Sequence, residues 1–224
     1  MSRVYLYALL SAAPAGETGV GISHEPLRTV TADGLVALVG DVVEPPAVSA
    51  EALRAQDTLV SRLAGALDAV LPARFGTVVA DDAALTQVLA RRRTELMQAL
   101  QRVAGCEQMT LRIWGERSAP MPPAAAGGDG PGSRYLAGRR HAHERARRAA
   151  ELDGLRPALV GLVREERIER HDRPPLLATV QHLISRGASA RYRATVEAGG
   201  ALLAPWRVSV SGPWLPYAFG ETAA

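Results

Sequence analysis

The 224-residue sequence contains no lysine and a single cysteine, Cys106. One cysteine cannot form a disulfide within the chain, which is typical of proteins from the reducing cytoplasm. Cys106 has no lysine or histidine beside it, so we interpret it as a small buried hydrophobe rather than a nucleophile. Alanine and glycine are abundant, so we attribute the replacement of lysine by arginine to codon bias.

Long hydrophobic runs are also missing. No stretch of about eighteen apolar residues exists, which excludes a membrane-spanning helix. The N-terminus lacks a sustained apolar segment with a small-residue cleavage site, and Tyr5 and Tyr7 alternate as in a strand, so we predict a first β-strand rather than a signal peptide. A net charge of +3 points to no particular partner, and 47% hydrophobic residues suffice for a core.

The motifs of common active sites are absent as well. The chain has no glycine-rich phosphate-binding loop and no cysteine or histidine spacing suited to a metal. His141 and His143 are two residues apart and would point to different sides of a helix. Arginines crowd residues 134–148, but they wrap around the expected helix, so a solvated face or a protein contact is favoured over nucleic acid. We therefore expect no enzyme, cofactor, metal, small-molecule substrate or nucleic acid.

The first 105 residues predict a strand, a hairpin and two helices. The strand covers residues 4–10, and the hairpin covers residues 27–39 around the turn pair Asp33-Gly34. Ser49 caps a helix whose apolar stripe continues to Leu71 and stops at Pro72. Asp81-Asp82 opens a second helix that runs to Val103, with Gly105 as its C-cap. Residues 71–79 form a short turn and strand between them.

Residues 106–224 predict a second α+β domain. Strands are expected at 106–114, 168–171, 176–184 and 206–211, and helices at 135–164 and 189–199. Residues 118–133 are rich in proline and glycine and predict a mobile loop. The order β-α-β-β-α-β is that of a ferredoxin-like unit, a four-stranded antiparallel sheet covered by two helices. The fold class is therefore α+β, with domains at 1–105 and 106–224.

The C-terminal tail, residues 212–224, is unusual. Four of the ten aromatic residues fall near the end of the chain, with Pro213 and Pro216 among them. Burying one such ring is worth about 1.5–3 kcal/mol, so the tail should fold back or bind a partner protein. The candidate protein-binding residues are Trp206, Trp214, Tyr217 and Phe219.

Three stretches together resemble the GvpF/GvpL family of gas vesicle accessory proteins. They are Leu71-Pro72-Ala73-Arg74-Phe75-Gly76-Thr77, Gly105-Cys106-Glu107-Gln108-Met109-Thr110-Leu111-Arg112, and Gly212-Pro213-Trp214-Leu215-Pro216-Tyr217-Ala218-Phe219. Their order and spacing hold across the chain. Two positions depart from the family pattern: Gln56-Asp57 replaces an expected histidine, and Leu215 replaces a proline.

The resemblance implies a cytoplasmic, vesicle-associated assembly factor that binds the shell protein GvpA and other gas vesicle accessory proteins. It also marks Arg74, Phe75, Gly76 and Glu107 as structural motif residues. We expect Arg74 to be buried and paired with a carboxylate or carbonyl. Two alternatives remain: a small-molecule-binding regulatory module, by analogy with other ferredoxin-like domains, and a nucleic-acid binder.

Overall fold

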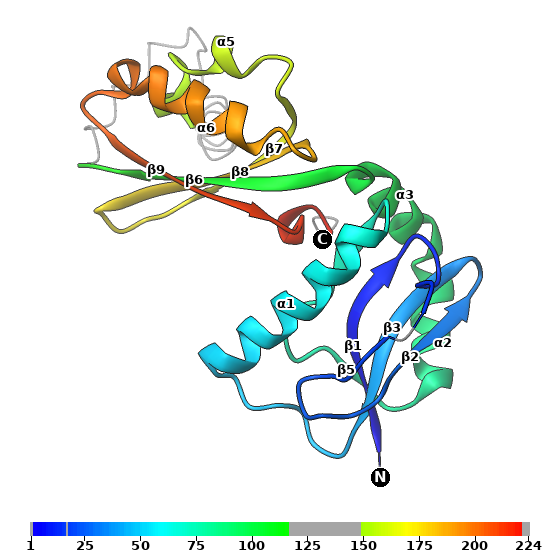
Figure 1. The fold of residues 1–224 in the computed structure, drawn as a ribbon. Helices are drawn as coiled ribbons and strands as arrows, with labels where there is room; N and C mark the ends of the chain where they lie inside the picture. Colours follow the sequence, from blue (N-terminus) through cyan, green and yellow to red (C-terminus); the bar gives the residue numbers. More distant parts are fainter. Residues whose placement is uncertain (1, 17, 117–148, 221–224) are drawn as a thin grey trace, which may run out of the picture. The chain divides into compact units, whose positions relative to one another are not determined.

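The computed structural model describes residues 2–16, 18–116 and 149–220. The predicted loop at 118–133 and the arginine-rich stretch up to residue 148 lie outside these ranges. The chain forms two compact units, one made of the described residues up to Glu107 together with those from Trp214 onward, and the other of Gln108–Pro213. Both units combine helices with a sheet, as an α+β chain should (Figure 1).

The first unit is built on a sheet whose strands are paired in the order β2-β3-β1-β4, with β5 also pairing with β1. The strands are β1 (Arg3–Leu10), β2 (Leu27–Ala32), β3 (Leu35–Val42), β4 (Val70–Pro72) and β5 (Val78–Val79). All of the pairings in this sheet are antiparallel. The first predicted strand and the hairpin are thereby confirmed.

The hairpin turn at Asp33-Gly34 has the backbone conformation that these two residue types favour. Asp33 and Gly34 have φ angles of 50° and 83°, so both central residues adopt the left-handed conformation that a tight two-residue turn requires. The pairing of Ala32 with Leu35 follows directly.

Helices of the first unit begin where the capping residues predict. The Ser49 side chain accepts a hydrogen bond from the Ala52 N–H at 3.0 Å and caps α1 (Ala50–Ala66). The Asp81 carboxylate accepts from the Ala84 N–H at 2.8 Å and caps α2 (Asp82–Arg91). Both caps satisfy amides that have no partner inside the helix.

Two helix ends differ from prediction. α1 stops at Ala66 rather than Leu71, because Val70 and Leu71 pair with β1 as strand β4. The second predicted helix is interrupted at Arg92, after which α3 (Arg93–Val103) begins. Gly105 follows α3 with a φ of 62°, as expected for the residue that terminates a helix.

Buried side chains cover both faces of the first sheet. Val60 and Leu63 of α1 pack with Tyr5, Tyr7 and Leu38 on one face. α2 and α3 lie behind the sheet in Figure 1 and bury their own leucines, Leu85, Leu89, Leu96 and Leu100.

The second unit has a four-stranded sheet in the order β7-β8-β6-β9. Its strands are β6 (Cys106–Trp114), β7 (Val163–Arg170), β8 (Leu176–Ser185) and β9 (Arg207–Trp214). Helix α6 (Ser189–Ala198) and the short 3-10 helix η2 (Gly200–Leu203) connect β8 to β9. The predictions of β6, β8 and α6 are confirmed, and β7 begins five residues earlier than the predicted strand at 168.

The predicted long helix at 135–164 is wrong in its described part. Residues 149–164 form a 3-10 turn, η1 (Ala150–Leu152), and the one-turn helix α5 (Arg156–Leu159), and β7 starts at Val163. Pro157 lies in the first turn of α5, where its missing N–H costs nothing. Gly161 has a φ of 80°, which ends the helical path.

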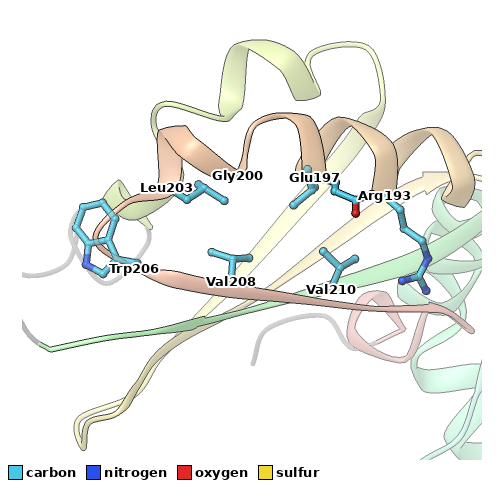
Figure 2. Close-up of a pocket in the computed structure, with 8 residues that line it drawn as sticks. Arg193, Glu197, Gly200, Leu203, Trp206, Val208 and Val210 are labelled. Atoms are coloured by element: carbon cyan, nitrogen blue, oxygen red, sulfur yellow. The ribbon is translucent and has the colours of Figure 1, made fainter.

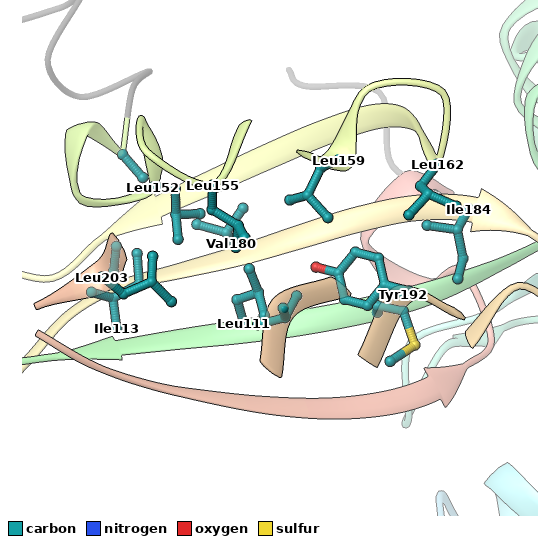
Figure 3. Packing of buried hydrophobic residues seen from close by; sticks show 14 residues of the cluster. Leu111, Ile113, Leu152, Leu155, Leu159, Leu162, Val180, Ile184, Tyr192 and Leu203 are labelled. Carbon is teal, nitrogen blue, oxygen red and sulfur yellow. The ribbon is translucent and has the colours of Figure 1, made fainter. Parts of the chain in front are cut away.

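The core of the second unit lies between the sheet and these helical segments (Figure 3). Leu111 and Ile113 of β6 and Val180 of β8 face Leu155 and Tyr192. The alternation of Met109, Leu111 and Ile113 therefore marks the core face, as the sequence predicts.

Candidate interaction surfaces

The tail packs in the first unit, whereas the sequence analysis placed it in the second domain. Phe219, in the 3-10 turn η3 (Tyr217–Phe219), is fully buried. The Tyr217 hydroxyl donates to the Asp57 carboxylate of α1 at 3.1 Å, and burial together with this carboxylate raises the pKa of Tyr217. The tail therefore folds back on the protein because the first unit offers both an apolar site and a polar partner.

Residues on either side of η3 extend this anchorage. Leu215 packs against the cluster that α1 forms with the sheet. On the other side of η3, Gly220 lies close to the Leu71 side chain of β4, since a Cβ added to Gly220 would be 3.4 Å from it. Trp214, near the start of the tail, is 45% exposed, whereas Leu215 and Tyr217 are half-buried. It is the aromatic ring of the tail that is most available to another molecule.

Trp206 belongs to a different surface. It lies in the second unit, where it packs partly against the core, and it lines a groove beside β9 (Figure 2). The four aromatic residues predicted to bind a partner are therefore divided: Phe219 and Tyr217 are anchors, Trp214 is exposed, and Trp206 borders the groove.

The motif Arg74-Phe75-Gly76 forms a turn held by Tyr5. The Gly76 N–H donates to the Tyr5 hydroxyl at 2.9 Å, and Gly76 has a φ of 83°, a conformation that favours glycine. The Phe75 ring meets the Tyr5 ring edge-on, with 6.2 Å between centroids. The Arg74 carbonyl accepts from the Thr77 hydroxyl at 2.7 Å and closes the turn.

The prediction that Arg74 is buried is wrong. Its side chain is exposed, because the left-handed turn at Gly76 directs the loop outward from the sheet while Phe75 turns inward. Its backbone carbonyl closes the turn by accepting from Thr77. Glu107, the other charged residue of the motif, is half-buried near the start of β6.

Gln56 is a hub that sequence reasoning missed. It is 3% exposed, accepts from the Tyr5 hydroxyl at 2.7 Å and donates to the Ala73 carbonyl at 3.0 Å. It therefore joins α1 to β1 and to the motif turn. The available signal was a polar residue in the buried stripe of α1, four residues before Val60.

A second buried polar cluster lies in the second unit. His182 is 1% exposed, with its Nε2 2.9 Å from Glu166 Oε2 and its Nδ1 2.6 Å from the Tyr192 hydroxyl. Arg156 also donates to Glu166, at 2.9 Å. Burial opposes ionisation of Glu166, but these two donors outweigh it and hold the pKa of Glu166 below its ordinary value. The cluster therefore ties β7, β8, α5 and α6 together.

The groove beside β9 holds about 470 Å³ and is lined by α6, η2 and β9. Figure 2 shows Val208 and Val210 pointing from β9 toward α6, with Trp206 at one end and Arg193 at the other. A second hollow of about 580 Å³ lies beside the C-terminal end of β6, between Trp114, Pro174, Pro175 and Arg207. Glu116 and Arg207 are its ionisable lining residues.

Within the described ranges, no group of three or more histidine, cysteine, aspartate or glutamate side chains could hold a metal ion. None of the helices in these ranges is both long and apolar enough to cross a membrane.

Comparisons with known proteins agree on one family. Residues 3–221 match the family model described as gas vesicle synthesis protein GvpL/GvpF. The chain is 28% identical over 254 aligned residues to gas vesicle protein L of a Streptomyces species, covering 98% of this chain and 93% of that protein.

Solved structures of two relatives share the fold. The crystal structure of GvpF from Anabaena sp. PCC7120 has a TM-score of 0.72 at 19% identity, covering all of this chain and 98% of that one. GvpF from Microcystis aeruginosa has a TM-score of 0.73 at 18% identity, covering 98% and 99%. The similarity extends over both units.

Proposed function

The chain belongs to the gas vesicle synthesis protein family GvpL/GvpF, and on this premise we propose that it is an accessory factor that binds the shell protein GvpA and other gas vesicle proteins while the shell is nucleated or grows. In this proposal it acts in the cytoplasm by binding and turns over no substrate. A shell subunit that lines a gas space carries an apolar face, and such a face aggregates unless another surface covers it.

The exposed ring of Trp214 is the observation that carries the proposal. Phe219 and Tyr217 are held by the first unit, so the tail that bears Trp214 is already ordered. An ordered aromatic side chain loses little conformational entropy when it binds, and tryptophan is enriched among residues that dominate protein interfaces. Trp214 is therefore suited to contact an apolar face of a partner.

Co-purification tests this proposal. The full chain carrying an affinity tag would be produced together with GvpA, and we expect GvpA to be retained with it. Trp214→Ala should reduce the retained GvpA by tenfold or more, about 1.4 kcal/mol or above, whereas Trp214→Phe should keep most of it. Val48→Ala, at a side chain that is 79% exposed in the same unit, serves as the matched control and should leave retention unchanged.

Failure has two distinguishable forms. If the wild-type chain retains no GvpA, the proposed partner is wrong. If Trp214→Ala and wild type retain equal amounts, GvpA binds elsewhere and Trp214 has no part in it.

We also propose that the second unit is ferredoxin-like. The order β7-β8-β6-β9 supports this, since the first and third strands of the unit lie at the centre and the second and fourth at the edges. A small-molecule-binding module is a function that this fold also serves, but the analogy alone supports it. Glu116 and Arg207 beside Trp114 specify no ligand class, so assembly remains our proposal.

A further inference from the structure

The sheet of the second unit ends in two edge strands of opposite character. β7 has charged side chains at six of its eight positions, and these include Arg170, which pairs with Glu151 at 2.7 Å, and Glu166, which pairs with Arg156 at 2.9 Å. Charged residues and covering segments protect sheet edges from pairing with other strands. The β7 edge is therefore protected from pairing with a further strand.

β9 carries less protection of this kind, limited to Arg207 at its start and Pro213 near its end. It has one charged residue, Arg207, among its eight, and no other strand in the described residues pairs with its outer side. Valine and serine, which favour strands or tolerate them, occupy its middle. An edge of this kind can accept an additional strand.

The groove of Figure 2 runs along this open edge. Arg193, Val196, Glu197 and Gly200 line it from the helical side, and their spacing of three and four residues places them on one face. Any strand that extends the sheet beyond β9 would therefore also bring side chains against this face.

We propose that a second copy of this chain occupies the groove, with the two β9 strands paired antiparallel about a two-fold axis. Arg193 and Glu197 are both exposed, carry opposite charge and lie one turn apart on α6. A two-fold axis reverses the direction of α6, so Arg193 of each copy meets Glu197 of the other. A two-fold interface requires such self-complementarity, because the same patch is used by both copies.

The placement of Arg193 strengthens this assignment. Its guanidinium donates to the Gly212 carbonyl near the end of β9 and is thereby held over the open edge. A guanidinium has five N–H donors, so this bond leaves others to reach a carboxylate. Exposed ion pairs add little affinity, but they select the partner and the register, while the valines and the strand backbone provide the contact area.

Sedimentation equilibrium and light scattering on the purified full chain test the inference, which goes beyond the proposed function. We expect a concentration-dependent species of twice 23.7 kDa. Arg193→Glu and Glu197→Arg should each raise the dimer dissociation constant about tenfold or more, because like charges then face one another. An equimolar mixture of the two variants should restore dimers, since each then supplies the charge that the other lacks.

Glu169→Arg on β7 is the matched control, an exposed charge reversal on the opposite edge, and should leave dimerisation unchanged. Circular dichroism would verify that every variant is folded. A wild-type chain that stays monomeric up to about 100 μM, within the range of weak specific interfaces, would overturn the inference. A dimer whose dissociation constant is unchanged in both Arg193→Glu and Glu197→Arg would also overturn it. The same holds if the wild-type chain is a monomer and these two variants no longer bind a gas vesicle protein that the wild-type chain binds, because the β9 edge would then bind a different partner.

Discussion

At the scale of single residues, Tyr5 joins three segments of the first unit. Its buried hydroxyl donates to Gln56 in α1 and accepts from the Gly76 N–H in the motif turn. Tyr5→Phe leaves both of these partners without their hydrogen bond, and we expect it to lower the free energy of unfolding by about 1–3 kcal/mol. Urea unfolding of the full chain measures this.

Tyr217→Phe is the comparison for that experiment. It removes one hydrogen bond to Asp57, which is only partly buried, so we expect a loss of about 0.5–1 kcal/mol. Equal losses in the two variants would show that the Tyr5 hydroxyl is not the junction that the geometry indicates.

Glu166 makes stability depend on pH. Its pKa in the folded protein lies below the ordinary value of 4.5, because hydrogen bonds from His182 and Arg156 outweigh the effect of burial. A carboxyl with a lowered folded pKa contributes stability that is present above its unfolded pKa and is lost as pH falls through the folded pKa. Wild type should therefore exceed Glu166→Gln in unfolding free energy near neutral pH, and the difference should shrink as pH falls below 4.5. If the unfolding free energies of wild type and Glu166→Gln differed by the same amount from about pH 3 to 7, this linkage would be contradicted.

At the scale of elements, the tail is an integral part of the first unit. Phe219 is fully buried in η3, so Phe219→Ala should cost about 3–5 kcal/mol of unfolding free energy. Trp214 lies five residues earlier with nearly half its surface exposed, so Trp214→Ala should cost about 1 kcal/mol or less. Thermal or urea unfolding of both variants checks the contrast, and a neutral Phe219→Ala would refute the anchored tail.

Local signals predicted the elements that depend on neighbouring residues. The turn at Asp33-Gly34, the caps at Ser49 and Asp81, and the strand Cys106–Trp114 were all readable, because each depends on backbone conformation or alternation within a few positions.

Elements whose conformation depends on contacts with residues far away in the sequence could not be predicted from local patterns. Val70 and Leu71 fit the apolar spacing of α1 equally well, and only their pairing with β1 makes them a strand. The aromatic residues of the tail predicted that the tail would be buried against other residues. They did not predict which unit it packs against, because Tyr217 and its partner Asp57 are 160 positions apart. Arg74 was misplaced for the same reason, since its exposure depends on how the Gly76 turn meets Tyr5.

At the scale of the whole molecule, the two units present different surfaces. The first unit carries the exposed Trp214, and the second carries the open β9 edge with its groove of mixed apolar and charged side chains. Taken together, the two proposals describe a chain with one surface for a shell component and another for its own copy, and such a chain would bring shell subunits together. This account treats the protein as a binding factor whose work is done by apolar surface.

The most direct test of that claim is the solubility of GvpA in a host that makes no gas vesicles. GvpA would be produced alone, with the wild-type chain and with Trp214→Ala, and the GvpA remaining in the supernatant after ultracentrifugation would be quantified. We predict that the wild-type chain keeps GvpA in the supernatant as a complex with it, and that Trp214→Ala loses most of this effect. GvpA that sediments to the same extent with and without the wild-type chain would contradict the account.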